Sequence, residues 1–333
     1  MDPKVSVILL SYNQENYIAE AINSVLNQTY SNLELIVSDN GSPDDTQKVI
    51  KQFEGDERVM LLLHSSNEYV TKRYNQALNH AKGQFVSLLY GDDFYLPNKI
   101  EKQMKIFETL SSDWGVVHGP GFELNETTKD KYQSKVANVH GKALKGILDQ
   151  CYSVGFINPI SPLVRRECCE KYKCYEDLFT EGESIYMKFA LSYKFYLLDE
   201  PLVVMREHDQ NARWYSKRNI EIQDACLERL IDFKEFPADC LKSLRHLRVK
   251  NYKIGAWENI RLSSQLDKAW VRERLHKTFK LDPLQLLFPK NIVSLMFTFL
   301  PHFLRKIFNI FLDYLTGRKK QLYFDKSFIK MKE

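Results

Sequence analysis

The chain has 333 residues, of which 44% are hydrophobic and 27% charged, and its formal net charge at pH 7 is +4. This composition is typical of a folded globular protein and argues against intrinsic disorder. A net charge this small, without zinc-ligand spacing or a basic Gly-rich tail, argues against a dedicated nucleic-acid-binding protein.

The cysteines and the N-terminus indicate a reduced, cytoplasmic protein. None of the six cysteines lies in a CxxC pair, and Cys168 and Cys169 are adjacent, which suits neither a disulfide framework nor a metal site. The first apolar run has no basic segment before it and no small-residue cleavage site. We therefore expect a first strand there rather than a signal peptide.

The first hundred residues alternate between strand and helix patterns. Four apolar runs of strand length are separated by three stretches with helical periodicity or helix-capping signals. The runs are KVSVILLSY (4–12), LELIVSD (33–39), VMLLLHS (59–65) and QFVSLLY (84–90). This alternation predicts a doubly wound, mostly parallel α/β sheet with helices on both faces. Continuously apolar strands agree with burial on both faces.

The rest of the chain is less regular and then becomes helical. Residues 111–215 contain shorter strand and helix patterns, and from residue 216 glycine nearly disappears while helical patterns dominate. We therefore place a domain boundary between residues 215 and 216, with a mainly helical region over 216–333.

The segment 285–320 is the most apolar part of the helical region. Pro289, Pro301, Arg305 and Lys306 interrupt it, so no run of the roughly 20 apolar residues that a membrane-spanning helix needs remains. Two alternatives fit. One is a helical hairpin packed on the main domain, and the other is a pair of basic amphipathic helices lying in a membrane interface.

Polar side chains follow three of the predicted strands. SYNQE (11–15) follows the first, SDNGSPDD (38–45) the second and YGDDFY (90–95) the fourth. In an open parallel sheet the carboxyl ends of the strands meet at one edge, where ligands bind. Asp39 at the end of the second strand is placed to hydrogen-bond a nucleotide, or alternatively to cap the next helix.

Asp92 and Asp93 are adjacent like charges, which repel unless a cation or a proton offsets them. Carboxylate oxygens at such an edge suit Mg²⁺ or Mn²⁺, which bind one or two carboxylates together with substrate phosphates. The alternative is a solvated pair that caps the helix near Pro97. No Gly-rich phosphate loop is present, so a metal on this pair would hold the phosphates.

Three segments together resemble the family 2 glycosyltransferases, which have the nucleotide-sugar-binding GT-A fold. Residues 5–46 resemble the opening of that family, AKGQFVSLLYGDDFYLPNKIEKQ (81–103) its DXD region, and EPLVVMREHDQN (200–211) a later segment with an Arg-x-His motif. The likeness covers about residues 3–213 and is closest in the first 100. It implies a nucleotide-binding half over 1–110 and an acceptor half over 111–215.

The resemblance implies roles for individual residues. The residues expected to contact the nucleotide are polar residues after the first two strands, one arginine in the third helix, and one of the two adjacent aspartates. They are Ser11, Tyr12, Asn13, Glu15, Asp39, Arg73 and Asp92. Metal contacts fall to Asp92 and Asp93, with His208 reaching the metal or the diphosphate. Tyr90 stands where the family usually has the first acid of its triplet.

The catalytic base is the largest departure from the family pattern. Family members use the Asp of a Glu-Asp pair that opens a helix to remove the proton of the acceptor hydroxyl. Here the matching text is TEGESIYMKFAL (180–191), which offers Glu181 or, after a one-residue gap, Glu183. The alternative is that both glutamates only favour the helix N-terminus through its dipole.

The function implied by the resemblance is transfer of a sugar, mostly with inversion, from a nucleoside-diphosphate donor to an acceptor hydroxyl. The donor is expected to be a UDP-sugar, with Mn²⁺ or Mg²⁺. The acceptor is expected to be a glycan or lipid-linked glycan of bacterial surface polysaccharide, with peripheral membrane contact through residues 285–320. The missing Glu-Asp pair leaves open an impaired nucleotide-sugar-binding or scaffold protein. The absence of a Gly-rich triphosphate loop argues against a nucleotidyltransferase.

Overall fold

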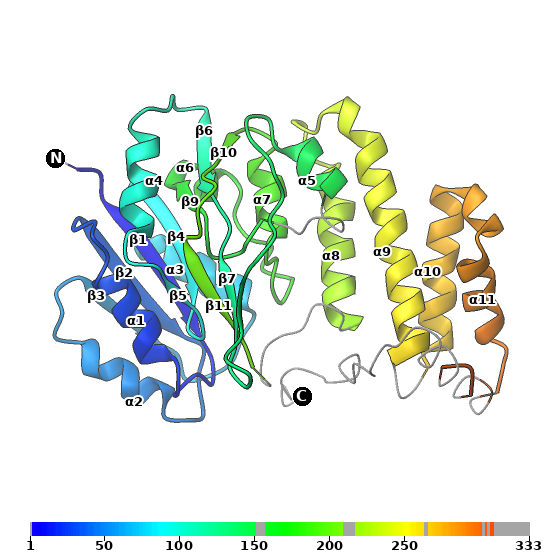
Figure 1. Ribbon diagram of the computed structural model, residues 1–333, viewed down its shortest axis with the longest axis horizontal. Coiled ribbons are helices and arrows are strands. Elements are labelled where there is room, and N and C mark those ends of the chain that lie inside the picture. The colour runs from blue at the N-terminus through cyan, green and yellow to red at the C-terminus, as the bar shows by residue number, and fades with distance from the viewer. Residues whose placement is uncertain are drawn as a thin grey trace. The chain divides into compact units, whose positions relative to one another are not determined.

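The computed structural model describes residues 2–150, 157–208, 217–262, 266–301, 304 and 307–309 (Figure 1). The chain divides into two compact units. Residues 1–211 with 235–237 form the first, and residues 212–234 with 238–333 form the second. The predicted boundary between residues 215 and 216 falls outside the described residues.

A seven-stranded sheet forms the centre of the first unit. Its strands, in spatial order, are β10 (Lys194–Leu197), β6 (Trp114–His118), β9 (Leu163–Arg165), β4 (Phe85–Tyr90), β1 (Val5–Ser11), β2 (Leu33–Asp39) and β3 (Val59–Leu63). All neighbours are parallel except β9, which is antiparallel to both β4 and β6. The predicted mostly parallel α/β sheet is therefore confirmed.

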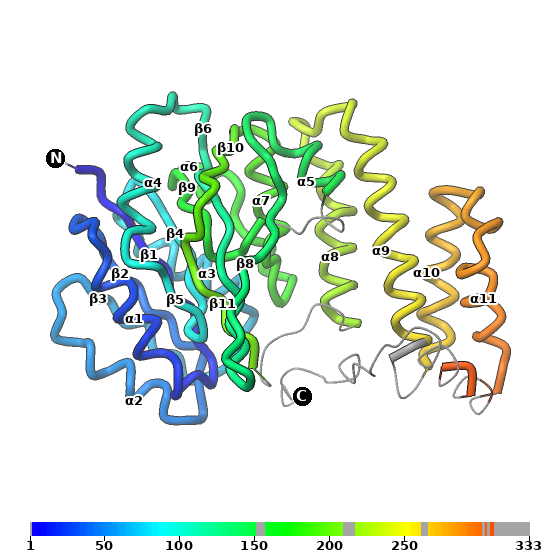
Figure 2. The backbone as a smooth tube through the Cα atoms, in the orientation of Figure 1, coloured from blue at the N-terminus to red at the C-terminus, as the bar shows by residue number. Residues whose placement is uncertain are grey.

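Helices cover both faces of this sheet, as the path of the tube in Figure 2 illustrates. Alternate side chains of β1 point to opposite faces, because the side-chain period of a strand is two. Leu9 packs in one core cluster with Ile18 of α1 (Ile18–Leu26), whereas Leu10 lines a pocket with Tyr74 of α3 (Val70–His80). The remaining helices of this unit are α2 (Thr46–Ile50), the 3-10 helix η1 (Lys51–Phe53), α4 (Lys99–Phe107), α5 (Leu144–Gln150), α6 (Arg166–Lys171) and α7 (Ser184–Phe189).

A smaller sheet brings distant parts of the chain to the carboxyl edge of the large one. Its order is β5 (Phe94–Tyr95), β11 (Val203–Glu207), β7 (Phe122–Asn125) and β8 (Lys131–Gln133). In the antiparallel pair β5–β11, Val204 lies opposite Phe94. Since β5 directly follows the two aspartates, this pairing carries the end of β11 to them.

The second unit is helical, as predicted. It contains α8 (Lys217–Leu230), η2 (Ala238–Cys240), α9 (Leu241–Leu262), α10 (Lys268–Leu281), η3 (Pro283–Leu287) and α11 (Pro289–Phe297). Its core cluster includes Ile220 of α8, Ile260 of α9, Val271 of α10 and Phe297 of α11. Among the described residues, none of the helices combines the length and the apolar character needed to cross a membrane.

Candidate active site

The two adjacent aspartates lie in the turn between β4 and β5. Asp93 is buried, and its Oδ1 accepts a hydrogen bond of 2.8 Å from the backbone N–H of Arg206. Burial, with the negative charge of Asp92 adding to it, raises the pKa of Asp93 well above its ordinary value. A Cβ at Gly91 would press on the side-chain ends of Gln14 and Ile18, so glycine lets this turn lie close to the start of α1.

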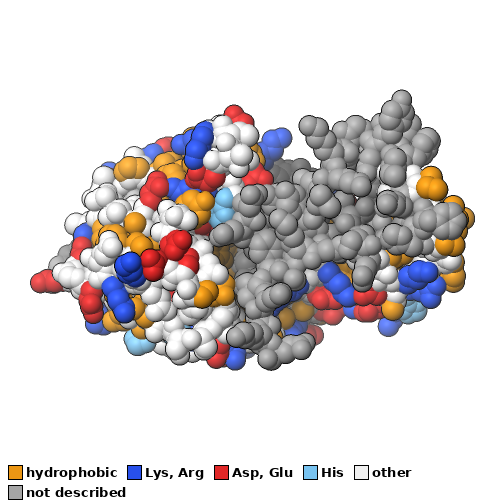
Figure 3. All heavy atoms as spheres, turned by 90° about the horizontal axis from the view of Figure 1, so that it is seen from below, with side chains coloured by type: hydrophobic (Ala, Val, Ile, Leu, Met, Phe, Trp, Pro, Cys, Tyr) orange, Lys and Arg blue, Asp and Glu red, His pale blue; other side chains and the backbone are white. Residues whose placement is uncertain are grey.

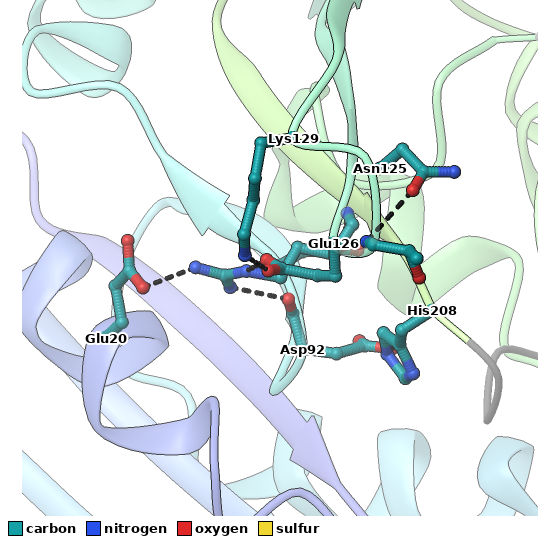
Figure 4. A network of polar contacts seen from close by, with 9 residues as sticks. Glu20, Asp92, Asn125, Glu126, Lys129 and His208 are labelled. Atoms are coloured by element: carbon teal, nitrogen blue, oxygen red, sulfur yellow. Dashed lines mark hydrogen bonds and ion pairs between the residues drawn. The ribbon is translucent and has the colours of Figure 1, made fainter.

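The guanidinium of Arg206 ties the turn to two other elements (Figure 4). Its side chain is 4% exposed, and it donates to the backbone carbonyl of Asp92 at 2.7 Å, to Glu126 at 2.6 Å and to Glu20 of α1. Glu126 also pairs with Lys129. Sequence reasoning noted the Arg-x-His motif but assigned no role to Arg206, and it missed both acidic partners.

His208 meets the acid pair from the end of β11. Its Nε2 lies 3.2 Å from Oδ2 of Asp92, and its ring stacks on Tyr17 with centroids 4.8 Å apart and an interplanar angle of 24°. The side chains of Asp92 and His208 are both largely buried. The structure thus brings together Asp92 and His208, two of the three residues predicted to hold a metal.

The third predicted ligand, Asp93, turns its carboxylate to the backbone of β11 instead. Within the described part of the chain, no group of three or more His, Cys, Asp or Glu side chains is gathered as a metal cluster. Mg²⁺ and Mn²⁺ sites in nucleotide enzymes commonly use one or two protein ligands and complete the shell with phosphate oxygens and water. A carboxylate oxygen and an imidazole nitrogen at Asp92 and His208 fit that limited role.

Asp39 lies at the end of β2, fully buried. Its carboxylate accepts hydrogen bonds from the hydroxyl of Ser11, the hydroxyl and backbone N–H of Ser42, and the amide of Gln47, at 2.5–3.1 Å. In the parallel register Ser11 is directly opposite Asp39, which explains their contact. Asp39 therefore organises the loop after β2, and direct contact with a nucleotide stays a prediction.

The loop after β1 holds a strained residue with an unsatisfied acceptor. Asn13 has φ of +55°, which non-glycine residues adopt infrequently, and its backbone N–H donates to Ser42 at 2.9 Å. Its buried Oδ1 has no hydrogen-bond partner in the structure as described. Neighbouring Tyr12 is partly buried, while Glu15 accepts from the backbone N–H of Asp45 at 2.9 Å.

Arg73 is buried in α3 and contacts the loops after β2 and β3. Its guanidinium donates to Asn40 at 2.9 Å, to Gln76 at 3.0 Å and to the carbonyl of Ser66 at 2.7 Å. Burial lowers the pKa of this guanidinium. The structure thus places Arg73 as a cross-link between the loops after β2 and β3, and a phosphate contact stays a prediction.

The two glutamates proposed as the base have different surroundings. Glu181 is buried and forms an ion pair of 2.8 Å with Lys188, whose side chain is also buried. Glu183 is partly buried at the N-cap of α7, and burial raises its pKa to about 7. Glu183 therefore has a proton affinity that suits a general base near neutral pH, whereas Glu181 is already engaged by Lys188.

Tyr90 is the last residue of β4, two residues before Asp92. Burial raises the pKa of its phenol, and the charges of Glu183, Asp93 and Asp92 add to this effect. Tyr90 also lines a mainly apolar pocket together with Leu10, Leu88, Ile185 and Tyr186. Tyr90 therefore lies at the carboxyl edge of the sheet and in the lining of this pocket, to which Glu181 also belongs.

Comparison with known proteins identifies the family. The family model described as "Glycosyl transferase family 2" matches residues 6–172. The chain belongs to glycosyl transferase family 2. The family resemblance of the sequence is thereby confirmed, and the protein is a glycosyltransferase.

Relatives and solved structures agree with this assignment. The Escherichia coli enzyme UDP-Glc:alpha-D-GlcNAc-diphosphoundecaprenol beta-1,3-glucosyltransferase WfgD is 34% identical over 173 residues, which cover 50% of this chain and 67% of that protein. Several other curated relatives are matched over only 15–39% of their own length. Substrates of those proteins are therefore not transferred to this chain as facts.

The fold has counterparts among solved glycosyltransferases. The crystal structure of Staphylococcus aureus TarS 1–349 in complex with UDP-GlcNAc has a TM-score of 0.69 at 17% identity, and the match covers 95% of this chain and 92% of that chain. Mannosyltransferase PcManGT from Pyrobaculum calidifontis, in complex with GDP-Man and Mn²⁺, has a TM-score of 0.57 at 14% identity, with coverage of 96% and 89%. The predicted GT-A-like fold is confirmed.

Proposed function

We propose that this family 2 glycosyltransferase moves a sugar from a UDP-sugar to a hydroxyl of a lipid-linked glycan, with inversion at the sugar carbon. The observation that carries the proposal is the Asp92–His208 pair, 3.2 Å apart, at the carboxyl ends of β4 and β11. The name of WfgD, which describes a UDP-glucose donor and a diphosphoundecaprenol-linked acceptor, supports the donor and the acceptor class.

The loop after β1 is the proposed binding site for the nucleobase of the donor. The buried Oδ1 of Asn13 needs a donor, and an N–H of a uracil ring would supply one. The carboxylate of Asp39 holds this loop in place by accepting hydrogen bonds from the hydroxyls of Ser11 and Ser42. Tyr12 and Glu15 lie close to Asn13 in the sequence, and we propose that they complete the pocket for the nucleobase.

Asp92 and His208 are the proposed holders of Mn²⁺ or Mg²⁺, which would neutralise charge on the departing nucleoside diphosphate. Their 3.2 Å separation offers one oxygen and one nitrogen ligand. Arg206 keeps Asp92 in place by binding its backbone carbonyl, while Asp93 fixes the turn to β11. This division gives the two aspartates different roles, binding for Asp92 and support for Asp93.

Glu183 is the proposed general base. The acceptor oxygen forms a bond to the sugar carbon, the bond from that carbon to the diphosphate breaks, and the hydroxyl proton passes to the Glu183 carboxylate. A carboxyl with a pKa of about 7 holds that proton more readily than an ordinary glutamate. Glu181, already paired with Lys188, is assigned to the fold of this region.

A donor panel tests the proposal. Release of nucleoside diphosphate is measured for the full chain with UDP-glucose, UDP-GlcNAc and GDP-mannose, with a polyprenyl-diphosphate-linked sugar as acceptor, with Mn²⁺ and with chelator. We expect acceptor-dependent release from a UDP-sugar that chelator suppresses and that Glu183→Gln lowers. Calorimetric UDP binding without turnover of any donor would favour the impaired binding protein instead.

A further inference from the structure

Helix α11 and the residues at its two ends expose four large apolar side chains. Phe288, Ile292, Met296 and Phe299 are 50%, 46%, 56% and 68% exposed. Their spacing of four, four and three residues puts them on one face of a helix. A surface helix of a water-soluble domain normally turns such a face to the core.

The inward face of the same helix combines the buried Phe297 with buried polar side chains. Asn291, Ser294 and Thr298 are 3%, 2% and 0% exposed. Asn291 donates to the carbonyl of Gln285 at 2.9 Å, and the Thr298 hydroxyl accepts from Arg272 at 3.0 Å. Together with the buried Phe297, these hydrogen bonds fix the rotation of α11 and leave Ile292 and Met296 on its outer side.

The exposed apolar surface extends into the preceding 3-10 helix. Leu284, Leu286 and Leu287 of η3 are 69%, 48% and 75% exposed. We call the combined surface the α11 strip, made of Leu284, Leu286, Leu287, Phe288, Ile292, Met296 and Phe299. In the space-filling view, hydrophobic side chains gather at one edge with Lys and Arg side chains beside them (Figure 3). A contiguous apolar surface rimmed by polar groups marks an interaction site.

Cations border the α11 strip. The Nζ of Lys253 lies 5.0 Å from the ring centroid of Phe288, and the guanidinium carbon of Arg272 lies 4.4 Å from that of Phe299. Lys290 is exposed in the first turn of α11. Residues 283–301 contain this lysine and no acidic residue. The strip therefore suits a partner that is both apolar and negatively charged.

Charge decides between the possible occupants. Residues 302–333 contain eight Lys or Arg and three Asp or Glu, so this segment offers the basic rim no net complementary charge. A second copy docked through the same strip would place its cations against identical cations. An anionic lipid surface offers acyl chains to the apolar residues and phosphates to the basic ones.

We propose that the α11 strip docks on anionic membrane lipid, with its apolar side chains in the boundary between headgroups and acyl chains. Lys253, Arg272 and Lys290 then face the lipid phosphates. This inference rests on the helical unit alone, and it would hold whether or not the transferase proposal is correct.

Flotation of the full chain with vesicles tests the proposal. One set of vesicles is phosphatidylcholine, and the other is equal parts of phosphatidylcholine and phosphatidylglycerol. We expect binding to the mixed vesicles that decreases with added salt, and at least roughly tenfold weaker binding for Ile292→Ser with Met296→Ser. The matched control is Ile231→Ser with Leu241→Ser, two side chains in the same unit that are 44% and 45% exposed.

A second pair of variants tests the role of charge. Lys253→Gln with Lys290→Gln should weaken binding about fivefold for each lysine, whereas Lys234→Gln with Lys242→Gln, exposed elsewhere in the same unit, should not. Equal binding to both kinds of vesicle, or loss of binding in the control pairs alone, would overturn the proposal. Unchanged thermal unfolding of each variant shows that it folds.

A polarity-sensitive dye on Ile292→Cys separates the three occupants. We expect a blue shift of its emission only with anionic vesicles. If the emission is already blue-shifted at high dilution and does not change when vesicles are added, the chain itself covers the strip. A blue shift that depends on protein concentration means a second copy. Either of these two results overturns the proposal.

Discussion

The imidazole of His208 lies 3.2 Å from the carboxylate of Asp92, although 116 residues separate them in the chain. Asp92 follows β4, and His208 follows β11, so the contact depends on the pairing of β11 with β5. This pairing produces the one carboxylate–imidazole pair that we assign to the metal, and the first two predictions test its two members separately.

Replacing Asp92 with Asn removes the proposed carboxylate ligand while it keeps the size of the side chain. We expect turnover of the UDP-sugar to fall about 10²–10³-fold, as for loss of one electrostatic stabiliser of a leaving group. The measurement is release of UDP under saturating Mn²⁺. Asp149→Asn, an exposed aspartate of α5, is the control and should keep wild-type turnover. Equal rates for the two variants would remove Asp92 from the site.

His208→Ala should raise the Mn²⁺ concentration needed for half-maximal turnover by about 10–100-fold, since the ring supplies one ligand or orients another. The effect on the maximal rate should be smaller than that of Asp92→Asn. Tyr17→Leu keeps the imidazole but removes its stacking partner, so we expect a shift of only a few fold. A metal titration that is identical for wild type and His208→Ala would contradict the assignment.

Arg206→Ala should destabilise the first unit by about 3 kcal/mol, because it removes a buried guanidinium that binds both Glu126 and the carbonyl of Asp92 and leaves Glu126 with only the exposed Lys129. The pair with Glu20 contributes little to this value, since the Glu20 side chain is mostly exposed. Urea unfolding measures the loss. Arg166→Ala removes a surface ion pair and should change stability by less than about 0.5 kcal/mol. Similar unfolding midpoints for both variants would disprove a positioning role.

The large sheet and the location of the site could be predicted from the sequence because both are local properties. Val5–Ser11 and Leu33–Asp39 are continuous apolar runs, and their polar ends must meet when the strands are parallel and in register. Strand β9, only three residues long and antiparallel, carries too short a pattern to reveal its direction.

The support of the site could not be predicted, because it depends on pairing between distant segments. Nothing within β11 shows that the backbone N–H of Arg206 binds Asp93, since periodicity reports which face is buried and not which strand lies alongside. The outward rotation of α11 is similar. Apolar residues lie on more than one side of this helix, and contacts of Phe297, Asn291 and Thr298 with the rest of the unit decide which side faces inward.

Glu181→Gln tests the fold-supporting role of the first candidate base. The change leaves the buried Lys188 charged without its partner, so we expect a loss of about 3–5 kcal/mol in the free energy of unfolding. Adding Lys188→Met should restore much of the stability. Turnover per folded molecule should stay within about threefold of wild type. A large loss of turnover at unchanged stability would instead make Glu181 the base.

Glu183→Gln should lower turnover by about 10²–10⁴-fold, the usual contribution of a general base. The wild-type rate should rise with pH through about pH 7, since only the ionised carboxylate accepts the proton, and this rise should disappear in the variant. Glu167→Gln, an exposed glutamate of α6, is the control for both measurements.

The raised pKa of Glu183 also leads to a separate prediction for the pH dependence of folding stability. Its pKa in the folded state, about 7, lies above the ordinary value of 4.5, so folding favours the protonated form. Wild type should therefore lose stability relative to Glu183→Gln as the pH rises from about 4.5 through 7. Above that range the variant should melt roughly 2–4 °C higher for each kcal/mol that ionisation costs, and below about pH 4.5 the difference should vanish. A melting difference independent of pH would show that Glu183 has an ordinary pKa, and the assignment of the base would fail with it.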